Sequence, residues 1–223
     1  MTQGLRTVIF DLDGTLADTS GDLLAAANGC FRDLGLGDLL DAGDAGVALR
    51  GGRAMLSLGF ARAGGRGAEE IERQYPRLLT RYEEAICEHT VLYPGAAEAV
   101  ERLRALGYAT GVCTNKPQGL SELLLGKLGV RGLFDSLVGA DTLPVRKPDP
   151  RPFVEAVTRA GGDPRRACLV GDTDTDHRTA RAAGVPSILV AFGPGGEDVA
   201  ALGPDVLLER YADLPGVVAR LVA

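Results

Sequence analysis

The stretch Thr7-Val8-Ile9-Phe10-Asp11-Leu12-Asp13-Gly14-Thr15 joins a short apolar run to two carboxylates that are separated by one residue. The apolar run is rich in β-branched and aromatic residues and stops at a turn, which is typical of a buried strand. If the chain curls after that strand, both carboxylates can face one reaction centre, and Gly14 eases such a curl. Acidic turns are common in proteins, so the stretch indicates a reactive site only where other parts of the chain converge on it.

Apolar runs of the same kind recur along the chain, with helical segments between them. The expected strands are residues 7–10, 109–113, 137–138, 167–170 and 187–191. A glycine follows each helical segment, where a helix C-cap favours that residue, and these segments are 95–106, 119–128 and 178–183. The alternation predicts βαβ units and hence an α/β fold, a doubly wound parallel sheet with a Rossmann-like core.

A long segment separates the first expected strand from the second. It carries apolar residues at helical spacing from Leu23 to Leu34 and a helical run from Glu69 to Cys87. We therefore expect residues 17–88 to form an inserted small helical cap domain. The α/β core is expected to consist of residues 1–16 and 89–223.

The bulk composition limits the kinds of partner. The 223 residues are 45% apolar and 24% charged, which is the mix of a soluble globular protein, and the formal net charge is -6. A negative chain without a basic stretch argues against a nucleic-acid-binding protein. No apolar segment reaches the length of a signal peptide or a membrane span, so we expect a cytoplasmic protein without a membrane partner. We expect it to be a monomer or a homodimer.

The cysteines and histidines do not form a metal motif. The chain has four cysteines without a CxxC pair and only two histidines, which argues against a zinc site. Cys113 and Cys168 lie in apolar runs, so we expect them to be buried free thiols.

Three further polar motifs follow expected strands, where open α/β sheets place their ligands. They are Thr114-Asn115-Lys116, Lys147-Pro148 and the acidic stretch from Gly171 to Asp176. Each has an ordinary explanation when it is taken alone: a polar turn, an exposed lysine and a helix N-cap. Their agreement in position carries more weight than any one of them.

Together the motifs run in the order DxDGT, TN, KP and GDxxxD, which resembles the haloacid dehalogenase superfamily. The resemblance covers essentially the whole chain. Four stretches and a following Ala-Ala-Gly look particularly like the phosphoglycolate phosphatase branch: Asp11–Asp18, Thr114–Pro117, Arg146–Pro148, Gly171–Asp176 and Ala182–Gly184. The insert is similar to the helical cap of that branch. The resemblance implies an enzyme that hydrolyses a small phosphorylated metabolite, with 2-phosphoglycolate as the expected substrate.

The resemblance also implies roles for individual core residues. Asp11 would be the nucleophile, which suits a carboxylate because it is already ionised at neutral pH. Asp13 would protonate the leaving alkoxide and later activate the water that hydrolyses the intermediate. Lys147 would neutralise the nucleophile and the transferring phosphoryl group. Thr114 and the backbone around Asn115 would bind the phosphoryl oxygens.

A divalent cation is expected in the same place, because several carboxylates and a phosphate dianion need a counter-charge. Mg²⁺ fits because it prefers oxygen ligands. By the resemblance its ligands would be the side chains of Asp11 and Asp172 and the main-chain carbonyl of Asp13. Asp176 would orient a metal-bound water, and direct ligation by Asp176 stays open.

Substrate selection is expected in the cap, because the core contacts mainly phosphate. Arg50 and Arg53 flank two glycines there, and a guanidinium can grip a carboxylate through two parallel hydrogen bonds. We therefore expect Arg50 or Arg53 to contact the substrate carboxylate. Three alternatives stay open on the sequence alone: a phosphatase for another small metabolite, a sugar-phosphate mutase of the same fold, and a non-catalytic phosphoacceptor or binding module.

Overall fold

The computed structural model describes residues 4–193 and 199–222. The chain forms two compact units. The first unit consists of Met1–Ala17 and Leu92–Ala223, and the second is Asp18–Val91.

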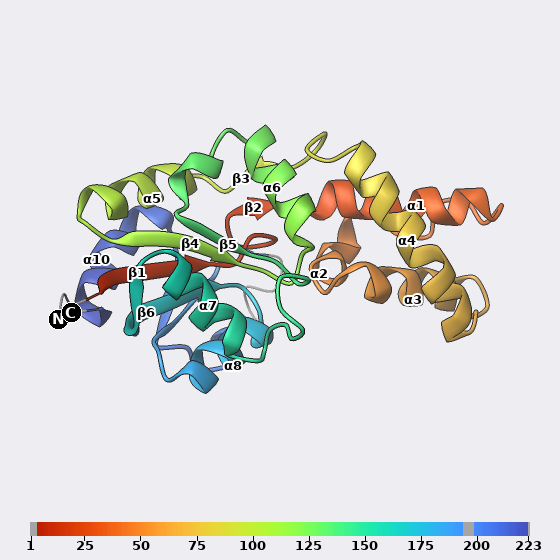
Figure 1. Cartoon of the computed structure of the whole chain (residues 1–223). Helices are drawn as coiled ribbons and strands as arrows, with labels where there is room; N and C mark the ends of the chain where they lie inside the picture. Colours follow the sequence, from red (N-terminus) through yellow and green to blue (C-terminus); the bar gives the residue numbers. More distant parts are fainter. Residues whose placement is uncertain (1–3, 194–198, 223) are drawn as a thin grey trace. The chain divides into compact units, whose positions relative to one another are not determined.

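Strands and helices alternate through the first unit, and the second unit is helical (Figure 1). The strands are β1 (Leu5–Phe10), β2 (Ala17–Asp18), β3 (Val91–Leu92), β4 (Ala109–Cys113), β5 (Ser136–Val138), β6 (Gly162–Gly171), β7 (Ser187–Val190) and β8 (Val206–Leu208). The helices of the first unit are α5 (Ala96–Ala105), α6 (Gln118–Lys127), α7 (Arg151–Arg159), α8 (Asp174–Ala183) and α10 (Leu214–Leu221). Those of the second unit are α1 (Ser20–Asp33), α2 (Ala45–Ala48), α3 (Gly52–Arg62) and α4 (Ala68–Glu84). Short 3-10 helices are η1 (Ala42–Asp44), η2 (Arg131–Leu133) and η3 (Tyr211–Asp213).

Six strands form a parallel sheet in the order β5-β4-β1-β6-β7-β8. The first strand of the chain lies inside this sheet: Thr7 of β1 is in register with Ala109 of β4 on one side and with Ala167 of β6 on the other. After β1, the chain adds β4 and then β5 on one side of β1. It then crosses to the other side of β1 and adds β6, β7 and β8 in turn. The order therefore reverses at β1. In open parallel sheets, ligands bind at the carboxyl ends of the strands beside such a switch point.

Helices cover both faces of the sheet (Figure 1). On one face α7 and α8 pack together, and Ile9 lies in an apolar cluster with Phe153 of α7. On the other face α5 and α10 contact each other, and the ring of Phe10 meets that of Phe134 with centroids 6.1 Å apart. Val8, Ile9 and Phe10 are fully buried. Burial on both faces explains why Val8, Ile9 and Phe10 form an unbroken apolar run and not an alternating one.

The second unit has its own apolar core. The rings of Phe31 in α1 and Phe60 in α3 meet edge to face, with centroids 5.2 Å apart. Gly59 permits this contact, because a Cβ at that position would lie only 2.1 Å from the Phe31 ring. The unit has nearly the boundaries of the predicted insert at 17–88, and its role as a cap stays a prediction.

A buried carboxylate in this unit is explained by its hydrogen bonds. Asp22 is 3% exposed and accepts bonds from the backbone N–H groups of Cys87, His89 and Thr90 and from the hydroxyl of Thr90. These bonds fasten the segment that follows α4 to the first turn of α1. Asp22 therefore stabilises the unit and has no need of a ligand to satisfy it.

The α/β class and the doubly wound parallel sheet are confirmed. The sequence pattern missed β8, because three residues are too few to show a period. It also placed the start of β6 at residue 167 and that of α8 at residue 178, whereas they begin at Gly162 and Asp174. In both cases the missed residues are mainly polar, so they add nothing to an apolar pattern.

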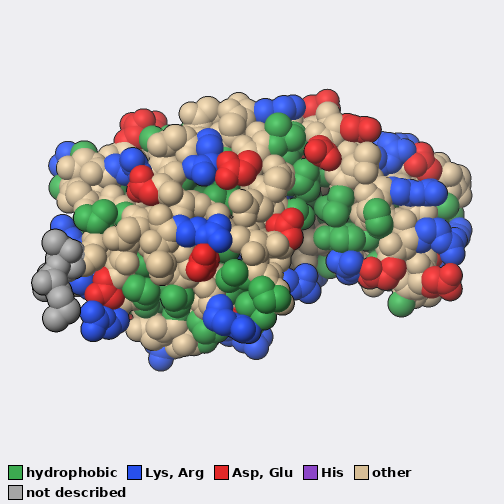
Figure 2. All heavy atoms as spheres, in the orientation of Figure 1, with side chains coloured by type: hydrophobic (Ala, Val, Ile, Leu, Met, Phe, Trp, Pro, Cys, Tyr) green, Lys and Arg blue, Asp and Glu red, His purple; other side chains and the backbone are tan. Residues whose placement is uncertain are grey.

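Charges of both signs lie next to one another on the face of the molecule seen in Figure 2. Among the described residues, ion pairs between neighbours in sequence include Arg151 with Asp149 and Arg165 with Asp163. This face therefore carries mixed charge. In the described ranges, no helix is both long enough and apolar enough to cross a membrane.

Candidate active site

The four sequence motifs meet at the carboxyl ends of neighbouring strands of the first unit. Asp11 and Asp13 follow β1, Thr114 follows β4, and Asp172 follows β6. Lys147 comes from the loop between β5 and α7. Because β4, β1 and β6 are adjacent, their loops converge at the switch point of the sheet.

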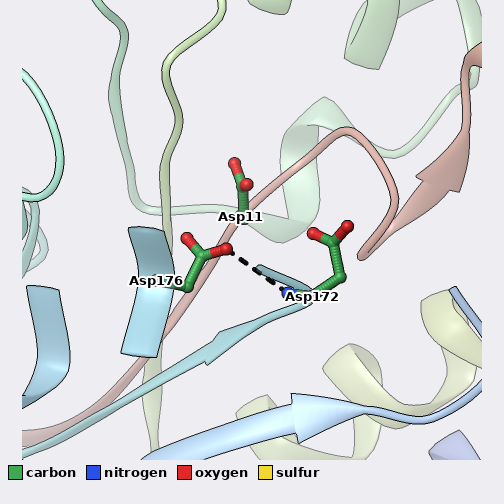
Figure 3. Close-up of side chains that lie close together, drawn as sticks. All are labelled: Asp11, Asp172 and Asp176. Carbon is green, nitrogen blue, oxygen red and sulfur yellow. Dashed lines mark hydrogen bonds between the residues drawn. The ribbon is translucent and has the colours of Figure 1, made fainter. Parts of the chain in front are cut away.

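Three buried carboxylates form the centre of the site. Asp11, Asp172 and Asp176 each offer one oxygen atom, and these atoms lie within 4.8 Å of one another (Figure 3). Asp11 comes from the loop after β1, Asp172 from the end of β6 and Asp176 from the first turn of α8. Like charges this close oppose one another's ionisation. The cluster is therefore a candidate cation site.

Asp176 has both carboxylate oxygens occupied by donors. Its Oδ1 accepts a bond from Lys147 Nζ at 2.6 Å. Its Oδ2 accepts from the backbone N–H and hydroxyl of Thr173 at 3.2 and 2.6 Å and from the backbone N–H of Asp172 at 3.3 Å (Figure 3). Gly171 leaves room for this side chain, because a Cβ there would lie 2.3 Å from the Asp176 Cβ. These bonds favour a supporting role for Asp176 over direct metal ligation.

Asp172 is held by a relay of hydrogen bonds from the far end of the chain. The Thr15 hydroxyl donates to Asp172 Oδ1 at 2.8 Å, and the Tyr211 hydroxyl donates to the Thr15 carbonyl at 2.7 Å. Burial raises the pKa of Asp172, and the charges of Asp176 and Asp11 raise it further. Tyr211 lies outside every motif, so the sequence offered no signal for its part in the site.

Asp11 is oriented through one of its oxygens. Its Oδ1 accepts a bond from the backbone N–H of Leu12 at 2.8 Å and lies 3.1 Å from Lys147 Nζ. Within the described residues, Oδ2 carries no such bond. Burial raises the pKa of Asp11 to about 6; Lys147 opposes this rise, whereas Asp176 and Asp13 add to it. The candidate nucleophile is thus fixed in place with one oxygen left for chemistry.

Lys147 lies between two carboxylates, 3.1 Å from Asp11 and 2.6 Å from Asp176, with a side chain only 1% exposed. Burial alone would lower the pKa of Lys147, but the two carboxylates outweigh burial and raise it. The ammonium therefore stays charged.

The side-chain amide of Asn115 donates to the Lys147 carbonyl at 3.1 Å, so this side chain positions the Lys147 loop. The phosphate contact predicted near Asn115 concerns its backbone.

Thr114 is placed to donate its hydroxyl proton. Its Oγ1 accepts a bond from the backbone N–H of Lys116 at 3.2 Å, and its own N–H donates to the Val138 carbonyl at 3.0 Å. A hydroxyl that accepts one bond still has its proton to give. This arrangement suits the predicted contact of Thr114 with a phosphoryl oxygen.

Asp13 forms an ion pair that the sequence reasoning missed. Lys116 Nζ contacts both carboxylate oxygens of Asp13, at 2.9 and 3.1 Å. The Lys116 side chain is 4% exposed and that of Asp13 is 17% exposed. Lys116 belongs to the Thr114-Asn115-Lys116 motif. A lysine in a turn is ordinarily solvated, so the motif gave no sign of the ion pair with Asp13.

The charges and ligand atoms of the site fit a magnesium ion. Asp11, Asp172 and Asp176, counted as ionised, face one ammonium group, that of Lys147, which leaves two negative charges in excess, the charge that one divalent cation balances. The donor atoms are all oxygen, which suits Mg²⁺ better than softer metals. Asp11 and Asp172 would hold the ion, with the main-chain carbonyl of Asp13 as the third predicted ligand.

Stabilisation by Mg²⁺ is expected to rise with pH, because protons and the cation compete for the same carboxylates. A pKa of about 6 for Asp11 lies above its ordinary value, so the folded chain holds this proton more tightly than the unfolded chain does. In EDTA, the contribution of Asp11 to stability should therefore fall as pH rises from about 4 to about 6. The cation reverses this trend. We expect its apparent Kd to rise about tenfold per pH unit below pH 6 for each ligand that must lose a proton.

The measurement is thermal unfolding with and without Mg²⁺ at pH 5 and pH 8. The upward shift in Tm should be larger at pH 8 and absent in Asp172→Asn. Asp163→Asn, at the opposite end of β6, should keep it. An equal shift at both pH values would contradict cation binding by these carboxylates.

The two predicted cap arginines belong to the second unit, and both are exposed. Arg53 is engaged within that unit: Nε and Nη2 donate to the Glu72 carboxylate at 2.6 and 2.8 Å, and the guanidinium lies 3.7 Å from the centroid of the Tyr75 ring. The edge of its guanidinium formed by Nε and Nη2 is therefore already engaged. Contact of Arg50 or Arg53 with substrate stays a prediction.

Comparison with known proteins agrees with the site. The family model for haloacid dehalogenase-like hydrolase matches residues 8–190. The chain is 39% identical over 210 residues to the phosphoglycolate phosphatase of Caulobacter vibrioides, covering 94% of this chain and 89% of that one. It is 37% identical over 206 residues to the phosphoglycolate phosphatase of Mesorhizobium japonicum, covering 92% and 90%. The crystal structure of a predicted phosphoglycolate phosphatase from Haemophilus somnus superposes with a TM-score of 0.83 at 26% identity, covering 97% and 99%. The chain therefore belongs to the haloacid dehalogenase-like hydrolase family and is one of its phosphatases.

Proposed function

We propose that this protein is a magnesium-dependent phosphatase that hydrolyses 2-phosphoglycolate through a phosphoryl-aspartate on Asp11. The observation that carries the mechanism is the buried Asp11 carboxylate, held by Lys147 and beside Asp172 at the end of the central strand. The names of the curated relatives support the choice of substrate.

In the first half of the reaction, Asp11 attacks phosphorus. A bond forms between an Asp11 carboxylate oxygen and phosphorus while the bond between phosphorus and the ester oxygen breaks. Asp13 gives its proton to that ester oxygen, so glycolate leaves as the alcohol and not as an alkoxide.

In the second half, water hydrolyses the aspartyl phosphate. Asp13, now ionised, takes a proton from the water as its oxygen attacks phosphorus. The bond between phosphorus and Asp11 breaks, inorganic phosphate leaves, and both carboxyl groups return to their starting forms.

Fixed positive charge and donors stabilise the phosphoryl group during both transfers. Lys147 offsets the charge that gathers beside Asp11, and the Thr114 hydroxyl and the Asn115 backbone N–H donate to phosphoryl oxygens. When bound by Asp11 and Asp172, Mg²⁺ would supply further positive charge to those oxygens.

The test is a panel of phosphorylated metabolites assayed for free phosphate, with Mg²⁺ or with EDTA. We expect 2-phosphoglycolate to give the highest kcat/KM, one glycolate per phosphate, and no activity in EDTA. Conversion of one hexose phosphate into its isomer without phosphate release would favour the mutase instead. If no phosphate monoester is hydrolysed in Mg²⁺, the proposed function is wrong.

A further inference from the structure

Two of the three lysines in the chain lie buried at the proposed site. One of them, Lys147, forms ion pairs with Asp11 and Asp176 and offsets charge beside the nucleophile. The other, Lys116, has no role in the mechanism above. Burying an ammonium group is costly unless an anion accompanies it, so a buried lysine beside a reaction centre requires an explanation.

The position of Lys116 is set by its own backbone. Its N–H donates to Thr114 Oγ1 at 3.2 Å, and its carbonyl accepts a bond from the backbone N–H of Ala140 at 2.9 Å. From this anchored turn after β4, the side chain reaches across to the Asp13 carboxylate. Lys116 thus lies between Thr114, which is proposed to hold the phosphoryl group, and Asp13, which is proposed to protonate the leaving group.

The leaving group must therefore come close to this ammonium. A general acid works from about 2.6 to 3.2 Å, so the ester oxygen must approach Asp13 to that distance. Lys116 Nζ is itself 2.9 and 3.1 Å from the two Asp13 oxygens. In 2-phosphoglycolate the carboxylate is separated from the ester oxygen by a single methylene, which brings an anion into the neighbourhood of Nζ.

The substrate carboxylate can also replace a counter-charge that the reaction removes. To act as general acid Asp13 must carry a proton, and Lys116 then loses the negative charge of this partner in a buried place, which is unfavourable. A carboxylate on the leaving group would restore the pair, whereas an uncharged leaving group would not. Arg53, one of the two earlier candidates for this contact, already binds Glu72.

We propose that Lys116 is a specificity-determining residue that binds the carboxylate of the leaving group, so that the α/β unit itself selects anionic substrates. This inference rests on the proposed phosphatase function and goes beyond it, because it assigns the choice of leaving group to the unit that carries the nucleophile.

The experiment compares 2-phosphoglycolate with ethyl phosphate, which has a methyl group in place of the carboxylate. In Lys116→Met, the ratio of kcat/KM for 2-phosphoglycolate to that for ethyl phosphate should fall roughly 10- to 150-fold, the range for loss of a charged hydrogen bond. Lys127→Met, which changes an exposed lysine at the end of α6, should leave the ratio unchanged. Equal losses on both substrates, or no change on either, would overturn the proposal.

A binding measurement covers the case in which Lys116→Met does not fold, as judged by circular dichroism. The wild-type protein should be inhibited at least about tenfold more tightly by 3-phosphonopropionate than by propylphosphonate, which lacks the carboxylate. Equal inhibition would overturn the proposal. Failure of the wild-type protein to hydrolyse any ester would instead contradict the phosphatase function, so the two failures are distinguishable.

Discussion

Asp11→Asn is expected to abolish phosphate release, with a loss of at least about 10⁴-fold, the scale on which covalent enzymes lose activity without a member of their nucleophilic machinery. The amide has nearly the shape of the carboxylate but cannot attack phosphorus. The hydrogen bond from the Leu12 N–H to Oδ1 can still be made to the amide oxygen, so the loop after β1 should keep its conformation. Phosphate release and circular dichroism of the purified variant are the two measurements.

Two controls make this result interpretable. Mass spectrometry must show that the new asparagine has not deamidated, because one part in a thousand of restored Asp11 would mask a larger loss. Asp174→Asn, an exposed carboxylate of the same acidic stretch as Asp172, should stay within a few-fold of the parent. Substantial activity in undeamidated Asp11→Asn would place the nucleophile elsewhere.

Asp13→Asn is expected to lower kcat by about 10²- to 10⁴-fold on 2-phosphoglycolate, the usual range for loss of a general acid and base. The variant should also show which half of the reaction suffers. An aryl ester such as p-nitrophenyl phosphate has a good leaving group and needs little protonation, so the first transfer should be less impaired for it than for the alkyl ester.

Rapid mixing of Asp13→Asn with p-nitrophenyl phosphate measures this directly. We expect a burst of p-nitrophenol of up to one per enzyme, followed by slow turnover, because water activation is lost. Activity within a few-fold of the parent on both esters would remove Asp13 from its assigned role.

The parts of the site that the sequence predicted are those that follow buried strands. Asp11, Thr114 and Asp172 each come directly after an apolar run, and parallel pairing of β4, β1 and β6 brings the ends of those runs together. The location of these residues at strand ends was therefore enough to predict that they lie together, without knowledge of any side-chain contact.

The parts that the sequence did not predict depend on side chains that reach across between loops. Lys116 and Tyr211 act through bonds to residues 103 and 196 positions away, and no local pattern encodes a partner at such separations. The ion pair of Arg53 with Glu72 is likewise a contact between two helices, α3 and α4. The sequence around each of these residues does not show whether its side chain makes such a contact or is solvated.

Because β1 lies inside the sheet, the site can form only when strands made later have paired with β1. Among the six strands of this sheet, β1 is synthesised first, yet one edge of β1 has no partner until β6 has been synthesised. The hydroxyl that secures Thr15 comes later still, with Tyr211. Because contacts of such long sequence separation form slowly, the nascent chain carries its reactive carboxylate without the neighbours that orient it until those later segments have been made. Catalytic competence is therefore acquired only after β6 and Tyr211 have been synthesised and have joined β1 and Thr15.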